Sequence, residues 1–423
     1  MLRQRGRVGL MAAALVGLAV GGAQAAVTTE RSASILVFPK VISNGTRDTI
    51  IQITNTGNSM VHAHCFYVNG ALTDPLAPPC NPSDPFCTNP PLWTELDFDI
   101  WLTKQQPTHW VVSLGRLEDP TDASCTNGSL NPPTPPFFGC NGAGLDPGHV
   151  PPQGEAFPGQ VFTGELKCIE VDETGAPVSG NHLKGEATLV TLDVCNPFTD
   201  ACEVFGNSCT SNSDCGGPID VAKYNAIGIP GNENNNGDNV LCLGGQVSEV
   251  CPNGAEYDAC PQTWIANVFS EGAPDPVDRE FDEADPFDSF VNTAFTIVPC
   301  TQNFESQTPE TVQINVLAWN EFEQQFSTGF PVTCWRELFL DEIDPVTFLF
   351  STMGTSFVQA RLRPSAQTAS GFLMVGEEFH TVDADSDAYT SVAAVNYHVE
   401  GERPGDFITI PIGQGGGGAG TTP

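Results

Sequence analysis

Short runs of alternating hydrophobic and polar residues fill most of this sequence from residue 27 onward, and the spacing typical of amphipathic helices is nearly absent. Alternation with a period of two places successive side chains on opposite faces of an extended strand. Most of the runs end at Pro, Gly, Asn or Asp, which are residues that favour turns. The pattern therefore predicts an all-β protein.

The clearest example is the segment 48–67, DTIIQITNTGNSMVHAHCFY. Two alternating runs flank the sequence Asn-Thr-Gly-Asn at 55–58, which has the composition of a tight turn, so this segment predicts a β-hairpin. A second pair of neighbouring strands is predicted over 161–171 and 183–194, because the sequence between them contains both Gly and Pro.

A version of the first segment recurs in the second half of the chain. Residues 49–53 match 311–314, and Cys65 matches Cys334. Further matches follow in the same order: 37–39 with 297–299, 183–187 with 374–378, 224–225 with 395–396, and 237–240 with 405–408. Ordered matches predict an internal repeat. Chance alignment of strands with similar composition is the alternative.

The repeat and the length of 423 residues predict two tandem antiparallel β-sandwiches. The pattern resembles the immunoglobulin-like domains of secreted bacterial surface proteins, and that resemblance carries no functional residue across. Sandwiches are favoured over closed barrels because long Pro-rich loops fit at sandwich ends. The expected domains are a first sandwich at 26–245, an acidic connector with cysteines at 246–290, a second sandwich at 291–413 and a disordered Gly-rich tail at 414–423.

A cysteine-rich insert is expected in the first sandwich at 195–215. Its end, CTSNSDCGG at 209–217, resembles the short cysteine-rich inserts of the Dickkopf N-terminal type. The resemblance is confined to this insert. It implies a segment that folds on disulfides rather than around an apolar core.

The first 25 residues have the features of a secretory signal peptide. Arg3, Arg5 and Arg7 precede an apolar run at 8–20, and Ala-Gln-Ala at 23–25 forms a small-residue cleavage site. No later segment is apolar enough to predict a transmembrane helix. We therefore expect an exported, soluble protein that is extracellular, at the cell surface or periplasmic.

Fifteen cysteines in an exported chain indicate disulfides, and the odd number leaves one unpaired. Zinc binding is the alternative, but the seven histidines are scattered and paired C-x-x-C motifs are absent from the sequence. Cys300 and Cys334 are the only cysteines in the predicted second sandwich, so they are predicted to pair. Two local disulfides are also predicted, namely Cys80 with Cys87 and Cys125 with Cys140.

Acidic residues outnumber basic ones by 51 to 16, and the formal net charge is −35. This charge disfavours nucleic acid and anionic lipid as partners, because both are polyanions. A solvated acidic surface is one interpretation and weak calcium binding is the other. The predicted calcium ligands are Asp383, Asp385 and Asp387, with the D-x-D-x-D spacing, and then Asp282, Asp285 and Asp288. The first motif departs from a calcium-binding EF-hand at Ala388 and Ala394.

His62 and His64 lie two residues apart and therefore share one strand face. They form either part of a transition-metal site or a solvent-facing pair. The chain contains none of the common hydrolase, metalloprotease or nucleotide-binding motifs. The sequence therefore predicts a non-enzymatic structural, adhesive or binding protein. A secreted hydrolase with accessory β-sandwich modules is the alternative.

Overall fold

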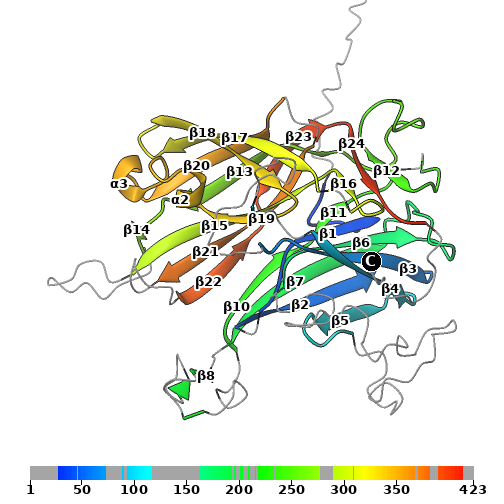
Figure 1. The fold of residues 1–423 in the computed structure, drawn as a ribbon, viewed down its shortest axis with the longest axis horizontal. Coiled ribbons are helices and arrows are strands. Elements are labelled where there is room, and N and C mark those ends of the chain that lie inside the picture. The colour runs from blue at the N-terminus through cyan, green and yellow to red at the C-terminus, as the bar shows by residue number, and fades with distance from the viewer. Residues whose placement is uncertain are drawn as a thin grey trace, which may run out of the picture.

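The computed structural model describes residues 27–412 except for 45, 73–87, 90–92, 117–161, 193–194, 197–200, 203–207, 210–214, 216–217, 233–234, 277–288, 308, 367–369 and 382–388. Strands account for most of this part of the chain (Figure 1), which confirms the predicted all-β class. The predicted signal peptide and Gly-rich tail lie outside it. No helix of the described residues is long and apolar enough to cross a membrane.

The first half of the chain supplies two antiparallel sheets. The first sheet consists of β11 (Ile227–Ile229), β1 (Ile35–Ser43), β6 (Phe162–Val171), β3 (Val61–Asn69) and β4 (Thr94–Leu102), in that spatial order. The second sheet consists of β10 (Pro218–Asn225), β7 (Leu183–Leu192), β2 (Arg47–Asn55) and β5 (Pro107–Val111). A separate strand pair, β8 (Cys195–Asn196) with β9 (Ala201–Cys202), belongs to the cysteine-rich insert.

Three more sheets complete the fold. The third sheet consists of β12 (Val240–Leu243), β24 (Asp406–Thr409) and β16 (Gln302–Asn303). The fourth consists of β18 (Gln325–Thr333), β17 (Thr311–Asn320), β20 (Phe357–Pro364), β13 (Cys260–Phe269) and β23 (His398–Arg403). The fifth consists of β14 (Ala273–Pro274), β15 (Phe290–Pro299), β21 (Phe372–Thr381) and β22 (Tyr389–Val395), with β19 (Arg336–Phe339) also paired to β15. Two short helices, α2 (Leu340–Ile343) and α3 (Phe350–Met353), follow β19.

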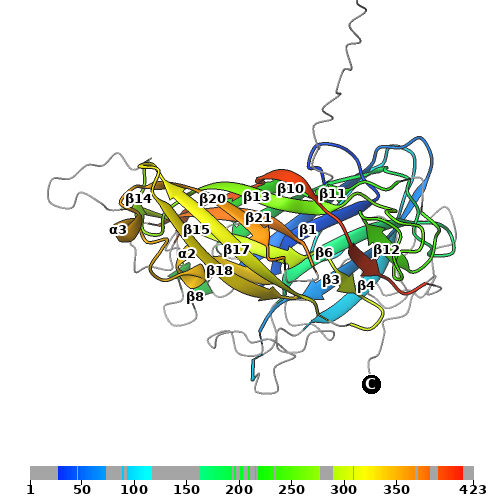
Figure 2. The ribbon, with the colours of Figure 1, turned by 90° about the horizontal axis from the view of Figure 1, so that it is seen from above.

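The five sheets form a five-bladed β-propeller, so the prediction of two tandem immunoglobulin-like β-sandwiches is wrong. Strands from distant parts of the chain share sheets. In the third sheet, β12, from the end of the predicted first sandwich, pairs with β24 from the end of the chain (Figures 1 and 2), and Leu241 lies opposite Ile408. The predicted connector supplies β13, which lies between β20 and β23. Alternation predicted the positions of many strands but carried no information about their partners.

The predicted hairpin at 48–67 is also wrong, because β2 belongs to the second sheet and β3 to the first. Asn55 explains the crossover. Its side-chain Nδ2 donates to the carbonyl oxygens of Ser59, Leu102 and Thr103 at 2.7, 3.2 and 2.9 Å, and its Oδ1 accepts from the backbone N–H of Gly57. A buried amide that satisfies these loop groups stabilises an arch between sheets instead of a tight turn. The second predicted pair, now β6 and β7, is divided between the same two sheets.

The predicted internal repeat is wrong as well. The matched segments 183–187 and 374–378 lie on β7 and β21, but these two strands have different kinds of partner. β7 pairs with β2, which carries the match at 49–53, whereas β21 pairs with β15, which carries the match at 297–299. The last matched segments are not equivalent copies either, because β12 and β24 pair with each other. The matches reflect shared strand composition.

The two halves of the chain share one hydrophobic core. A single cluster of buried side chains includes Phe38 and Tyr67 from the first half and Trp264 and Phe295 from the second. Trp335 Nε1 donates to the backbone oxygen of Pro39 at 2.7 Å. Because the apolar contacts are continuous, the halves are not independent folding units.

A buried charged cluster also joins the halves. We call it the Lys40 cluster: Lys40 on β1 and Arg47 on β2 contact Glu377 on β21, and Lys40 also contacts Glu337 on β19. Burial by itself would raise the pKa of Glu377, but the charges of Lys40 and Arg47 outweigh it and lower the pKa. The Phe379 ring lies 5.8 Å from Lys40 Nζ and 5.9 Å from the Arg47 guanidinium carbon.

Candidate functional site

A groove of 440 Å³ lies on the outward face of the second sheet. Alternation along β2 explains this face, because Ile51 and Ile53 are buried while Gln52 and Thr54 are partly exposed. Side chains of β5, β7 and β10 continue the face on both sides. The groove is lined by Gln52, Thr54, Thr56, Pro107, Thr108, His109, Lys184, Gly185, Glu186 and Lys223.

The strand register places groups of complementary character side by side in this groove. Gln52 lies opposite Glu186 on β7 and opposite His109 on β5. Lys223 forms a salt bridge with Glu186, and Lys184 Nζ donates to the backbone oxygen of Glu30 at 3.1 Å. The groove therefore offers hydroxyl, amide and ammonium donors next to carbonyl and carboxylate acceptors.

Gly185 keeps the floor of the groove close to the core. A Cβ at this position would lie 2.6 Å from Cζ of Phe38 and 3.2 Å from the backbone oxygen of Gln52. Such contacts are too short for a side chain, so glycine allows the Phe38 ring to pack directly beneath β7. The groove consequently lies on a rigid, well-packed support.

His62 and His64 lie in a different place, on the first sheet. Each imidazole is bound by a carboxylate of β4: His62 Nε2 lies 2.7 Å from Asp99 Oδ1, and His64 Nε2 lies 2.9 Å from Asp97 Oδ2. Their exposed fractions are only 6% and 4%, so the interpretation as a solvent-facing pair is wrong. Both ring nitrogens of His62 are occupied, since Nδ1 contacts the backbone oxygen of Asp172 at 2.9 Å. His62 therefore has no ring nitrogen left for a metal.

The carboxylates of β4 form a row, because Glu95, Asp97 and Asp99 alternate along the strand. Burial and the neighbouring charge of Asp97 raise the pKa of Glu95 to about 8. The sequence contained the signal for this row in the alternating acidic residues of TELDFDIWL. The prediction missed it because the pairing of β3 with β4 was not known.

Two further histidines contact carboxylates. His182 Nδ1 lies 2.7 Å from Glu170 Oε1, and His380 Nδ1 lies 2.7 Å from Asp275 Oδ2. Asp275 Oδ2 also accepts a hydrogen bond from Ser289 Oγ at 3.1 Å. In this arrangement the serine and the histidine both contact the carboxylate, whereas a hydrolase triad requires the histidine to lie between the other two residues.

The predicted calcium ligands Asp383, Asp385 and Asp387, and the second set Asp282, Asp285 and Asp288, lie outside the described residues. The predicted disulfides of Cys80 with Cys87 and of Cys125 with Cys140 also lie outside them. Calcium binding and these two local disulfides therefore stay predictions.

The predicted disulfide between Cys300 and Cys334 is wrong. Cys300 pairs with Cys260 on β13, with a Cα–Cα distance of 6.6 Å, and Cys334 is a buried free thiol. The sequence assigned Cys260 to a connector, although β13 packs within the fold. Further disulfides join Cys65 to Cys168, Cys202 to Cys215 and Cys242 to Cys251. Disulfides persist in an oxidising compartment, which fits an exported protein.

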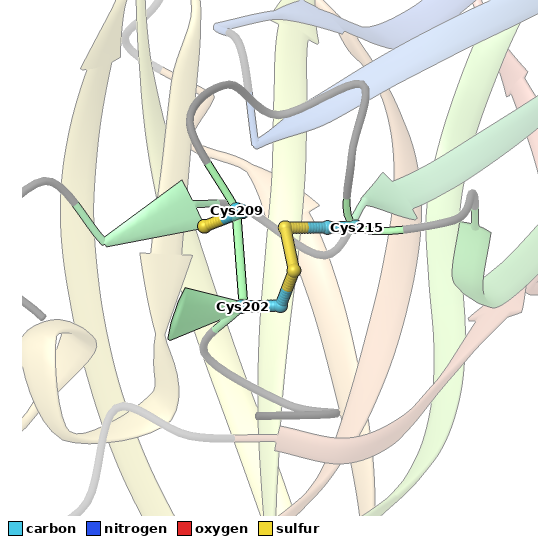
Figure 3. A group of neighbouring side chains, drawn as sticks. All are labelled: Cys202, Cys209 and Cys215. Carbon is cyan, nitrogen blue, oxygen red and sulfur yellow. A yellow bond between two sulfur atoms is a disulfide. The ribbon is translucent and has the colours of Figure 1, made fainter. Parts of the chain in front are cut away.

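Three cysteines of the insert lie close together (Figure 3). Cys202 and Cys215 are joined by a disulfide, and Cys209 is disulfide-bonded as well. Zinc requires thiolate ligands, so these oxidised sulfur atoms do not form a metal site.

No protein-family model, curated protein or solved structure matches this chain.

Proposed function

We propose that this chain is a secreted or cell-surface, non-enzymatic binding or adhesive protein, and that the groove of the second sheet is its contact surface. The observation that carries the proposal is the groove itself, in which polar side chains from four strands share one face above a rigid core. Rigid support lowers the entropy that is lost when a ligand is bound.

The chemistry of the groove indicates the class of ligand. Thr54 supplies a hydroxyl group that both donates and accepts. Thr56 Oγ1 donates to the backbone oxygen of His182 and keeps acceptor capacity, whereas Thr108 Oγ1 accepts from Arg116 Nε and keeps its proton to donate. Gln52 adds its amide group, and the charge of Lys223 is balanced by Glu186. Sugar hydroxyls need donors and acceptors together. A neutral, hydroxyl-rich polysaccharide fits this lining better than a polyanion, which the acidic protein surface would repel.

Glycan binding tests the proposal directly. The full-length protein is screened against neutral polysaccharides, and Thr54→Val and Gln52→Leu are compared with Ser327→Ala, a matched change on β18 outside the groove. Loss of one hydrogen bond is worth ~1 kcal/mol, so each groove variant should weaken binding roughly five-fold, while Ser327→Ala binds as the parent does. Equal binding by all variants, or no binding by the parent, contradicts the proposal.

A secreted hydrolase is the alternative, and it requires a histidine–carboxylate pair inside a cleft. The described residues contain such pairs at His62, His64, His182, His380 and His398. None of these five histidines lines the groove, and the histidine that does, His109, lies opposite Gln52 in the strand register. This distribution supports binding rather than hydrolysis at the groove.

A further inference from the structure

Three polar side chains meet inside the core where β6 of the first sheet contacts β16 of the third. Lys167 on β6 and Gln302 on β16 are 0% and 1% exposed. Glu165 precedes Lys167 by two residues, shares its face of β6 and is 0% exposed. We call these three residues the Lys167 cluster.

Within the Lys167 cluster, one carboxylate holds both nitrogen atoms. Glu165 Oε2 lies 2.7 Å from Lys167 Nζ, and Glu165 Oε1 accepts a hydrogen bond from Gln302 Nε2. Lys167 Nζ also donates to Gln302 Oε1. The lysine amine therefore lies against the glutamine amide group, and the carboxylate contacts both the amine and the amide nitrogen.

Aromatic rings surround the Lys167 cluster, and the buried thiol of Cys334 is close enough to interact electrostatically with Lys167 and Glu165. The Phe304 ring lies 5.8 Å from Lys167 Nζ, Phe66 stacks on Phe304 at 4.6 Å between ring centroids, and Trp93 contacts Phe304 edge-on at 5.8 Å. These rings exclude water. Burial lowers the pKa of Lys167 against the opposing effect of Glu165, so the ammonium loses its proton more easily to give the neutral amine, the form that acts as a nucleophile.

Gln302 is held in place by contacts of the two residues before it and by its own strand pairing. Cys300, two residues earlier, is bonded to Cys260, and Thr301 Oγ1 donates to Asp406 Oδ1 at 2.9 Å. Gln302 itself pairs with Ile408 of β24. The hydrogen bond from Lys167 Nζ to Gln302 Oε1 holds the amine beside the carbonyl group that it would attack. Groups that reach attack geometry within one site react as if at effective concentrations of about 10⁵–10⁸ M, which accelerates even the slow reaction of an amide.

We propose that Lys167 and Gln302 become joined by an intramolecular isopeptide bond, with Glu165 as the acid–base catalyst. Lys167 gives a proton to the Glu165 carboxylate, and the neutral amine attacks Cδ of Gln302. The Nζ–Cδ bond forms and the Cδ–Nε2 bond breaks. Glu165 then gives its proton to Nε2, which leaves as ammonia, and takes the second proton from Nζ. Glu165 therefore ends the reaction as a neutral carboxyl group. Atoms and charge balance, and no oxidant or reductant is needed.

The product removes a buried ion pair. Before the reaction the cluster holds an ammonium and a carboxylate in a water-free site, where the desolvation of each charge is unfavourable. After it, the site holds a neutral amide and a neutral carboxyl group. Escape of ammonia makes the reaction irreversible. The bond would fix β6 to β16 covalently, independently of any ligand at the groove.

Mass spectrometry of the secreted, full-length protein tests this proposal. After complete reduction and denaturation, the chain should be lighter than its sequence mass by one ammonia, and proteolysis should release a branched peptide that joins Lys167 to Gln302. Glu165→Gln and Lys167→Met should each have the full mass calculated from their own sequence, without the loss of ammonia. Lys40→Met, which alters the other buried lysine, should retain the ammonia loss and the branched peptide.

The result that would overturn the proposal is a parent protein at its full sequence mass. Ammonia loss with Lys167 and Gln302 recovered in separate linear peptides would also overturn it, because asparagine side chains release ammonia too. A branched peptide in Glu165→Gln would refute the catalytic role of Glu165. If a variant fails to fold, the peptide map of the parent still decides whether the bond exists.

Discussion

The Lys40 cluster and the Lys167 cluster both place a fully buried lysine between the two halves of the chain, yet they give the lysine different partners. Lys40 contacts the carboxylates of Glu337 and Glu377. Lys167 contacts one carboxylate, that of Glu165, and the amide of Gln302. Burial is the same in both clusters, so the partner decides the chemistry.

A carboxylate held ionised by two cations is a poor acceptor for an amine, because its negative charge repels the nucleophile's electron pair. Arg47 and Lys40 keep Glu377 in this form. An amide carries no charge and has nitrogen as a leaving group. The comparison teaches that the Lys40 cluster is a permanent ion pair, whereas the Lys167 cluster is arranged for reaction.

The largest expected effect comes from Lys167→Met. The proposed bond spans 135 residues of sequence, and the chain-entropy model used for disulfides assigns a cross-link of that span about 5 kcal/mol. The free energy of unfolding in denaturant should fall by about that amount. Glu165→Gln also prevents the bond but retains the lysine, and its free energy of unfolding should fall by a similar amount. Equal denaturation midpoints for the parent and both variants would show that the Lys167 cluster forms no bond, so that it would not differ from the Lys40 cluster in this respect.

Lys40→Met is expected to have the next largest effect. It leaves Glu337 without its lysine and unbalances the buried charge, and breaking a buried pair is destabilising by about 3–5 kcal/mol. The double variant Lys40→Met/Glu337→Gln keeps only the Arg47–Glu377 pair and should recover part of this loss in the same denaturant titration. A double variant less stable than Lys40→Met would show that the imbalance of charge is not the cause.

The Lys40 cluster should also make stability depend on pH. The pKa of Glu377 is lowered in the folded state from its ordinary value of 4.5. Its contribution to stability is therefore present above pH 4.5 and is lost as the pH falls through the lower, folded-state pKa. Unfolding measured at neutral pH and at several values below 4.5 should show a smaller acid-induced loss in Glu377→Gln than in the parent. Equal losses would exclude Glu377 as a source of the pH dependence.

The smallest expected effect is that of Cys334→Ala. The free thiol is buried, and its burial raises the pKa of Cys334, so it is not a reactive thiolate. Removing one buried heavy atom should lower the free energy of unfolding by about 1 kcal/mol. The branched peptide of Lys167 and Gln302 should persist, because the amine attacks the amide directly. Disappearance of that peptide in Cys334→Ala would show that the thiol takes part.

The candidate groove was only partly accessible to sequence reasoning. The alternation IIQIT on β2 predicted that Gln52 and Thr54 share a face, and the structure places them together in the groove. Lys223 and Glu186 were not predicted to join them, because their positions depend on which strands pair. The pairing of β10 with β7 and of β7 with β2 brings together residues from three distant segments.

The sequence by itself determined where many of the strands lie and which of their side chains share a face, since both follow from a local period of two. The same period implies that Glu165 and Lys167, two of the three charged residues of β6, lie on one face of that strand. Only the tertiary structure decided that Asn55 directs an arch, that Cys300 pairs with Cys260, and that Gln302 meets Lys167. These contacts join residues that are distant in sequence, and closing such long loops has nearly the same entropic cost for many alternative partners. The choice among partners is therefore made by the packing of the whole core.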